Sequence, residues 1–220
     1  MNKKIAQVVT GLPVEGFFDY SVDQALQEKI AVGQRVLIPF RGSRRVGCVV
    51  NLAEKSPIKN LKSIQCLLDT SPSVSPGLLK LTKKISEYYG CSWGEAVEMS
   101  LPTALRKNKF FDSPMATPSS PSSQKREAEP STILLHDLGQ SERWIFIRER
   151  IDETLLQENG VILVVPEISS IAHTVARLKD FLDVPIATLD KQLTPKEELE
   201  QWMMIRSGQA NIVVGTRSAI

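Results

Sequence analysis

The sequence predicts an α+β fold built from two modules: a small antiparallel β-barrel with one helix, followed by an incomplete α/β module with a parallel sheet. The first half contains short runs of β-branched residues bounded by Gly, Pro, Ser and Asn, as antiparallel strands do. The second half alternates short, continuous apolar runs with helix-forming stretches, a pattern typical of parallel sheets. The two halves therefore belong to different classes of sheet.

A Ser/Pro-rich segment separates the two modules. Residues 113–130 read SPMATPSSPSSQKREAEP, and nine of these 18 residues are Ser or Pro. Such a segment cannot bury enough apolar surface to offset its ordering entropy, which predicts a flexible linker. We therefore divide the chain into a domain at residues 1–112, a linker at 113–130 and a second domain at 131–220.

The first module is expected to contain strands followed by a helix. Its strands are predicted at residues 5–9, 35–40, 46–52 and 63–68. A helix is predicted at residues 75–89, with Ser75 as its N-cap and Pro76 at its first position. The apolar face of this helix is expected to pack inward and consists of Leu78, Leu81, Ile85, Tyr88 and Tyr89.

In the second module, strands and helices alternate. Strands are predicted at residues 133–135, 161–165, 186–189 and 212–214. Helices are predicted at about residues 141–157, 169–182 and 195–206. Thr194 and Glu197 form a capping-box pattern at the start of the last helix. Because parallel sheets of this type usually continue, the module that stops at Ile220 is expected to be incomplete.

The composition is that of a globular protein with no membrane segment. Hydrophobic residues make up 42% of the 220 residues, charged residues make up 24%, and no apolar run reaches 18 residues. The start, MNKKIAQVV, has too short an apolar run for a signal peptide, so we expect a cytoplasmic protein. Residues 1–112 carry 16 basic and 10 acidic residues, a net charge of +6, which favours a polyanionic partner such as nucleic acid.

The cysteine and histidine patterns predict no metal site. Cys48, Cys66 and Cys91 are odd in number and widely spaced, so neither a disulfide framework nor a zinc site is indicated. We expect them to be small core residues. His136 and His173 lack a paired His or Cys at ligand spacing, and we expect structural roles for both.

The junction between the first apolar run and the first helix of the second module lacks the residues of a phosphate-binding loop. It reads HDLGQSERW at residues 136–144. A P-loop at such a junction supplies glycines, a lysine and a Ser or Thr hydroxyl for magnesium. Here Arg143 takes the lysine position, Trp144 takes the hydroxyl position, and only Gly139 can relax the backbone.

The run FFDY, which contains Phe18, Asp19 and Tyr20, is the main candidate binding motif of the basic module. Aromatic faces can stack on a base, and a carboxylate can accept hydrogen bonds from a sugar hydroxyl or a base amine. A carboxylate is poorly suited to gripping phosphate but well suited to reading a free hydroxyl end. The alternative is a strand with core aromatic residues and a solvated aspartate.

Basic residues offer candidate phosphate contacts in the first module. Arg41, Arg44 and Arg45 lie at a predicted hairpin tip, and Lys59 and Lys62 form a second cluster. Each cluster could equally be a solvated loop.

One edge of the second module is a further candidate site. Glu167 and the segment GTRS at residues 215–218 each follow a predicted strand. They are therefore expected at the same carboxyl edge, where open α/β sheets bind ligands. The alternative is two ordinary strand-to-helix turns.

An ordered set of short segments runs through both modules. The first module carries FFDYSV, VGQRVLIPF, RRVGCVV, LKSIQCLLD, EYYGCSWGEA and LPTALR, and after the linker come LLH, VPEI and NIVVGTRSA. In this order the segments resemble the primosomal protein N′ family, the bacterial replication-restart DNA helicases. The resemblance covers nearly the whole chain except the linker, and the set that ends in GTRSA is specific.

The resemblance implies a DNA-binding site in the first module. In that family the first domain binds the 3′ end of a nascent strand at a stalled, branched DNA fork. The family pocket maps onto Phe18, Asp19, Tyr20 and Lys62. Asp19 would meet the terminal 3′ hydroxyl, with an aromatic ring beside the terminal base, and Lys62 would meet a backbone phosphate.

The second module is similar to the first half of the RecA-like helicase lobe of that family. Thr216 and Arg217 are then candidate phosphate contacts, as are Arg44 and Arg45 in the first module. Replication-restart proteins are further candidate partners.

The departures from the family concern ATP and zinc. The ATP loop of the family reads approximately GVTGSGKT, whereas residues 137–144 read DLGQSERW, which leaves Gly139, Ser141 and Arg143 as a degenerate loop. An arginine does not replace the loop lysine as a compact point charge. The magnesium-binding acidic motif, the second lobe and the cysteine-rich zinc region have no counterpart in the chain, and the linker takes the place of a winged-helix domain. ATP, magnesium and zinc are therefore not expected here.

These observations favour a DNA-binding protein in replication restart with no ATPase activity of its own and no catalytic residues. The alternative is a fragment of an ATP-dependent 3′→5′ DNA helicase of the primosome. A third reading is an interaction module that contacts replication proteins rather than DNA.

Overall fold

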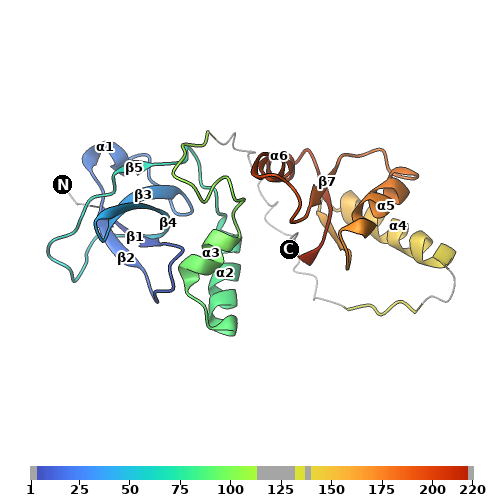
Figure 1. Ribbon diagram of the computed structural model, residues 1–220, viewed down its shortest axis with the longest axis horizontal. Helices are drawn as coiled ribbons and strands as arrows, with labels where there is room; N and C mark the ends of the chain where they lie inside the picture. The colour runs from blue at the N-terminus through green and yellow to red at the C-terminus, as the bar shows by residue number, and fades with distance from the viewer. Residues whose placement is uncertain (1–3, 113–131, 137–139, 218–220) are drawn as a thin grey trace. The chain divides into compact units, whose positions relative to one another are not determined.

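The computed structural model describes residues 4–112, 132–136 and 140–217. The chain forms two compact units, Met1–Pro114 and Met115–Ile220. The first unit is built on an antiparallel sheet and the second on a parallel sheet (Figure 1). Mixed α/β architecture with both kinds of sheet is therefore confirmed.

The sheet of the first unit has five strands in the order β2-β1-β4-β3-β5. Its strands are β1 (Ile5–Val9), β2 (Phe18–Ser21), β3 (Arg35–Phe40), β4 (Ser43–Ala53) and β5 (Cys66–Leu67). Its helices are α1 (Gln24–Gln27), α2 (Pro76–Tyr89) and α3 (Trp93–Met99). Alternate residues of the strands point into one apolar core, which includes Ala6, Val8, Tyr20, Val36, Ile38 and Val49.

The segment that leads into β5 joins the two edges of this sheet. The Ser21 amide donates to the carbonyl of Lys62 (3.0 Å), and the Ile64 amide donates to the carbonyl of Ser21 (3.1 Å). A few residues later, Cys66 and Leu67 pair with β3. The strand predicted at residues 63–68 is therefore shorter than expected, because the segment passes from β2 to β3 and pairs only briefly with each.

A buried ion pair fixes the end of the first unit to its sheet. The Arg35 guanidinium and the Asp69 carboxylate are both fully buried and bonded to each other. Arg35 also donates to the carbonyl oxygens of Leu105 and Lys109, so its N–H groups are used inside the protein. Residues 103–112, which contain little regular structure, are held in place by this side chain.

The helix α2 begins as predicted but buries a different face. Ser75 caps it by accepting from the Leu78 amide, and Pro76 is at its first position. The buried residues are Leu79, Thr82 and Ser86, whereas the predicted apolar face is largely exposed, including Leu81 (49%) and Tyr88 (82%). The prediction for this face was wrong. The hydroxyls of Thr82 and Ser86 can be buried because each donates to a carbonyl one turn earlier in the helix.

The sheet of the second unit has three parallel strands in the order β6-β8-β7. They are β6 (Val161–Val164), β7 (Ile186–Leu189) and β8 (Ile212–Gly215). The helices are α4 (Gln140–Leu156), α5 (Ser169–Lys179) and α6 (Pro195–Arg206). The capping box predicted for Thr194 and Glu197 is present, and the hydrogen bonds from Thr194 lower the pKa of the Glu197 carboxyl.

The strand predicted at residues 133–135 is not formed. Ile133, Leu134 and Leu135 have no regular structure and are 55%, 93% and 42% exposed. Among the residues that the structure describes, none pairs with this run in a ladder. A strand this short gains stability only from neighbours on both sides, so its apolar sequence alone does not make it a core strand.

Candidate nucleic-acid interface

A groove opens beside β2 in the first unit. It brings together residues from β2, from the β3–β4 hairpin and from the segment before β5: Val14, Phe17, Phe18, Asp19, Tyr20, Pro39, Phe40, Arg41, Ile58, Asn60, Leu61 and Lys62. The four residues that the sequence analysis assigned to a DNA 3′ end, Phe18, Asp19, Tyr20 and Lys62, all lie in this lining.

Aromatic side chains form part of the groove and part of the core. The Phe18 ring meets the Phe40 ring edge-on, with centroids 5.1 Å apart. Tyr20 is only 5% exposed, and its hydroxyl donates to the Pro39 carbonyl at 3.2 Å. Burial raises the pKa of the Tyr20 phenol, so this hydroxyl remains a neutral donor. Tyr20 thus has a structural role, whereas Phe17 is 48% exposed and offers an open ring.

Two side chains hold the Asp19 carboxylate on β2. Gln7 lies opposite Asp19 in the β1–β2 register, and its amide donates to Asp19 Oδ1 at 3.3 Å. Asn51 donates to Gln7 Oε1 at 2.9 Å, which turns the amide nitrogen of Gln7 toward the carboxylate. The Ser56 hydroxyl donates to Asp19 Oδ2 at 2.5 Å and itself accepts from the Ile58 amide.

This network leaves Asp19 as an acceptor with room for a further donor. Each of its oxygens receives one hydrogen bond within the protein, and an ionised carboxylate has more acceptor positions than that. A hydroxyl or an amine can therefore bind to it. A phosphate group, which carries the same sign of charge, is repelled.

Two cations line the groove. The side chain of Lys62 is exposed, while its carbonyl is fixed by the Ser21 amide. The Arg41 guanidinium carbon lies 5.6 Å from the centroid of the Phe40 ring, a cation–π arrangement. By contrast, Arg44 and Arg45 are exposed at the start of β4 and do not line the groove.

Sequence reasoning did not assign Gln7 or Ser56 to the site. Gln7 and Ser56 lie 12 and 37 residues from Asp19, so no local spacing relates them to it. Arg41 was a candidate phosphate contact from its place at the hairpin tip, but the sequence did not place it in one groove with Asp19. It precedes Gly42 in a tight turn between two strands, where Asn is the usual residue.

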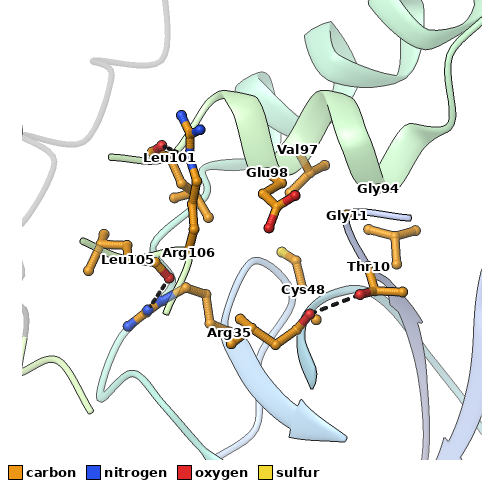
Figure 2. A pocket seen from close by; sticks show the side chains of 13 residues that line it. Thr10, Gly11, Arg35, Cys48, Gly94, Val97, Glu98, Leu101, Leu105 and Arg106 are labelled. Atoms are coloured by element: carbon orange, nitrogen blue, oxygen red, sulfur yellow. Dashed lines mark hydrogen bonds between the residues drawn. The ribbon is translucent and has the colours of Figure 1, made fainter. Parts of the chain in front are cut away.

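A second, small cavity lies between α3 and the sheet, and the residues that line it have structural roles (Figure 2). Thr10 donates to the Val46 carbonyl at 3.0 Å, and Arg35 reaches the Leu105 carbonyl. A Cβ at Gly94 would lie 1.9 Å from the Thr10 carbonyl oxygen, so α3 can approach β1 this closely only with glycine. Burial raises the pKa of the Cys48 thiol to about 12, which keeps it protonated and unreactive.

The candidate residues of the second unit follow the ends of its parallel strands. Val164 and Leu189 pair with Gly215 in the last rung, so Glu167, Thr216 and the exposed Arg217 come after the strands at the same edge.

The loop that would hold ATP falls partly outside the described residues. Gly139 is among the residues not described, and Ser141 lies in α4. Arg143 is exposed on α4, and Trp144 packs against the apolar core with the Arg177 guanidinium 5.8 Å from its ring centroid. Arg143 and Trp144, at the lysine and hydroxyl positions of a P-loop, therefore do not fit a nucleoside triphosphate with magnesium.

Within residues 4–112, 132–136 and 140–217, no three His, Cys, Asp or Glu side chains are grouped so as to hold a metal ion. No helix in the part of the chain that the structure describes combines the length and apolar character needed to cross a membrane.

Comparison with known families gives a match within the first unit. Residues 7–102 match the model of the PriA 3′ DNA-binding domain. The chain is 25% identical to the replication restart protein PriA of Haemophilus influenzae over 312 residues and 23% identical to that of Rickettsia typhi over 231 residues. In both cases the alignment covers 99% of this chain. The PriA of Chlamydia pneumoniae is 31% identical over 97 residues, which cover 44% of this chain.

The chain is much shorter than these relatives. The alignments cover 42% of the Haemophilus influenzae protein, 35% of the Rickettsia typhi protein and 13% of the Chlamydia pneumoniae protein. The similarity to the first two extends over both units, because almost all of this chain is aligned.

Proposed function

Because the chain corresponds to the N-terminal portion of a PriA-family replication restart protein, we propose that it binds DNA through its first unit and recognises a free 3′ end. The binding site is the groove beside β2, and the target is the 3′ end of a nascent strand at a branched fork. In this proposal the five-stranded sheet is a small, partly closed barrel, and the second unit is a partial RecA-like lobe.

The observation that carries this proposal is the setting of Asp19. Its carboxylate is held by Gln7 and Ser56 and retains acceptor positions for a hydroxyl donor. Aromatic rings and the cations of Lys62 and Arg41 line the same groove. A terminal nucleotide presents the matching groups: a 3′ hydroxyl, a base face and a backbone phosphate.

The second unit contributes DNA contacts rather than ATP hydrolysis. The carboxyl edge with Thr216 and the exposed Arg217 is suited to backbone phosphate. Arg143 and Trp144 occupy the positions that a nucleotide-binding lysine and hydroxyl would need, and Trp144 is used in the core. We therefore propose no ATPase activity for this chain, which acts in the cytoplasm with other restart proteins.

The test compares DNA ends that differ in one group. A fluorescent single strand with a free 3′ hydroxyl is titrated against the same strand with a 3′ phosphate, and anisotropy gives both dissociation constants. The hydroxyl end is expected to bind roughly tenfold more tightly, equivalent to about 1.4 kcal/mol. Equal affinities for the two ends would contradict the proposal.

The variant Asp19→Asn tests the assigned residue. An amide of the same shape carries no charge, so the preference for the hydroxyl end is expected to fall to about twofold or less, since hydrogen bonds to a charged group contribute about 1.5–3 kcal/mol. The matched control is Glu87→Gln on α2, an exposed carboxyl outside the groove, which keeps the preference. An unchanged end preference in Asp19→Asn would assign the recognition elsewhere.

A further inference from the structure

We propose that Arg41 is a DNA-contacting residue kept in a strained backbone conformation for that purpose, and that its guanidinium binds a phosphate of the strand whose end enters the groove. This inference rests on the proposed function and adds to it a specific contact.

The backbone of Arg41 is strained. Arg41 and Gly42 form the two-residue loop between β3 and β4, with Phe40 opposite Ser43 in the last rung. Their φ angles are 44° and 78°, both in the left-handed region. Such loops favour Asn-Gly, because a residue with a long side chain is unfavourable at positive φ. The loop itself gives no reason for arginine at this position.

The packing of the Arg41 side chain in the first unit does not explain this strain. It is exposed, and its described contact is the cation–π arrangement with Phe40. Strained residues that persist without a packing role are found at binding and catalytic sites. The Arg41 guanidinium and the Lys62 ammonium group both line the groove, so a phosphate of the DNA backbone can bind between or beside them.

The turn gives the proposal an unusual test, because stability and binding should change in opposite directions. Replacing Arg41 with Asn relieves the strain, so the melting temperature of the full chain is expected to rise by about 2–4 °C. The same variant loses the guanidinium. Its affinity for a fluorescent single strand with a free 3′ hydroxyl should fall roughly tenfold, and the slope of log affinity against log salt should decrease by about 0.7.

Two controls separate this contact from general charge effects. Arg41→Lys retains a cation at the turn and should keep the salt slope. Lys84→Asn on α2 removes one exposed charge outside the groove and should alter the affinity less than twofold.

The inference would be overturned if Arg41→Asn bound DNA with the affinity and the salt slope of the unaltered chain. It would also be overturned if Arg41→Asn and Lys84→Asn lost equal amounts of affinity. A drop in melting temperature together with weaker binding would also overturn it, because Arg41 would then be structural. If the unaltered chain still prefers the 3′ hydroxyl end in these cases, the proposed function stands. If the unaltered chain does not prefer the 3′ hydroxyl end, the proposed function itself is wrong, whatever the Arg41 variants show.

Discussion

Asp19 owes its setting to side chains that are remote in the sequence. Gln7 is positioned on the neighbouring strand by register, and Ser56 arrives from the loop after β4. Sequence reasoning could identify the carboxylate and its aromatic neighbours, because they form one contiguous run. It could not identify their partners, since strand register and loop path depend on the whole fold.

The hydroxyl of Ser56 offers a test of this support. In Ser56→Ala the Asp19 Oδ2 atom loses a donor, and the carboxylate is less restrained. The preference for a 3′ hydroxyl over a 3′ phosphate should fall about two- to threefold, equivalent to about 0.4–0.7 kcal/mol, at the lower end of what one hydrogen bond contributes. Ser56→Thr keeps the hydroxyl and should retain the preference. Anisotropy titrations of both variants check the expectation, and equal behaviour of Ala and Thr would argue against it.

Among the helices and strands, local signals predicted where elements begin better than which side they bury. The N-cap Ser75 and the capping box of Thr194 and Glu197 act within one turn, and both are present. The buried face of α2 depends instead on what packs against it. Trp93 donates from its ring nitrogen to the Thr82 hydroxyl at 3.2 Å, which makes a polar position part of the interface. Apolar periodicity alone selected the opposite side.

The two faces of α2 should respond differently to truncation. Leu79 is 6% exposed and Leu81 is 49% exposed. Leu79→Ala leaves a cavity and is expected to reduce the free energy of unfolding by about 2–4 kcal/mol. Leu81→Ala on the exposed face should change it by less than about 0.5 kcal/mol. Urea unfolding followed by circular dichroism measures both, and a larger loss for Leu81→Ala would mean that the predicted face is the packed one.

At the scale of the whole molecule, the first compact unit extends beyond the residue at which the family match ends. The family model ends at residue 102, whereas Arg35 donates to the carbonyl oxygens of Leu105 and Lys109. Those acceptors belong to the first unit, which extends to Pro114. The composition of the linker predicted a boundary near residue 112, but the buried ion pair that anchors the preceding segment has no signature in the sequence.

Two fragments test where the first unit ends. Residues 1–112 should fold cooperatively and keep the preference for a 3′ hydroxyl end, because every described partner of the groove and of Arg35 is included. Residues 1–102 lack two acceptors of a buried guanidinium and should be less stable by about 2–4 kcal/mol. Thermal and urea unfolding compare the two. Equal stability would show that residues 103–112 contribute nothing to the fold.

The anchoring of residues 105–112 also has a mechanical consequence. A pull on the chain from the direction of the second unit acts first on this segment. It is opposed by the Arg35 bonds to Leu105 and Lys109, by the Phe111 amide bond to the Leu68 carbonyl and by the Thr70 hydroxyl bond to Asp112. The Arg35 bonds lead into β3, an interior strand of the sheet, and the other two lead into the segment that follows β5. Tension along the chain would therefore act first on β3 and on the segment after β5, whereas Asp19 lies on β2, at the opposite edge of the sheet from β5.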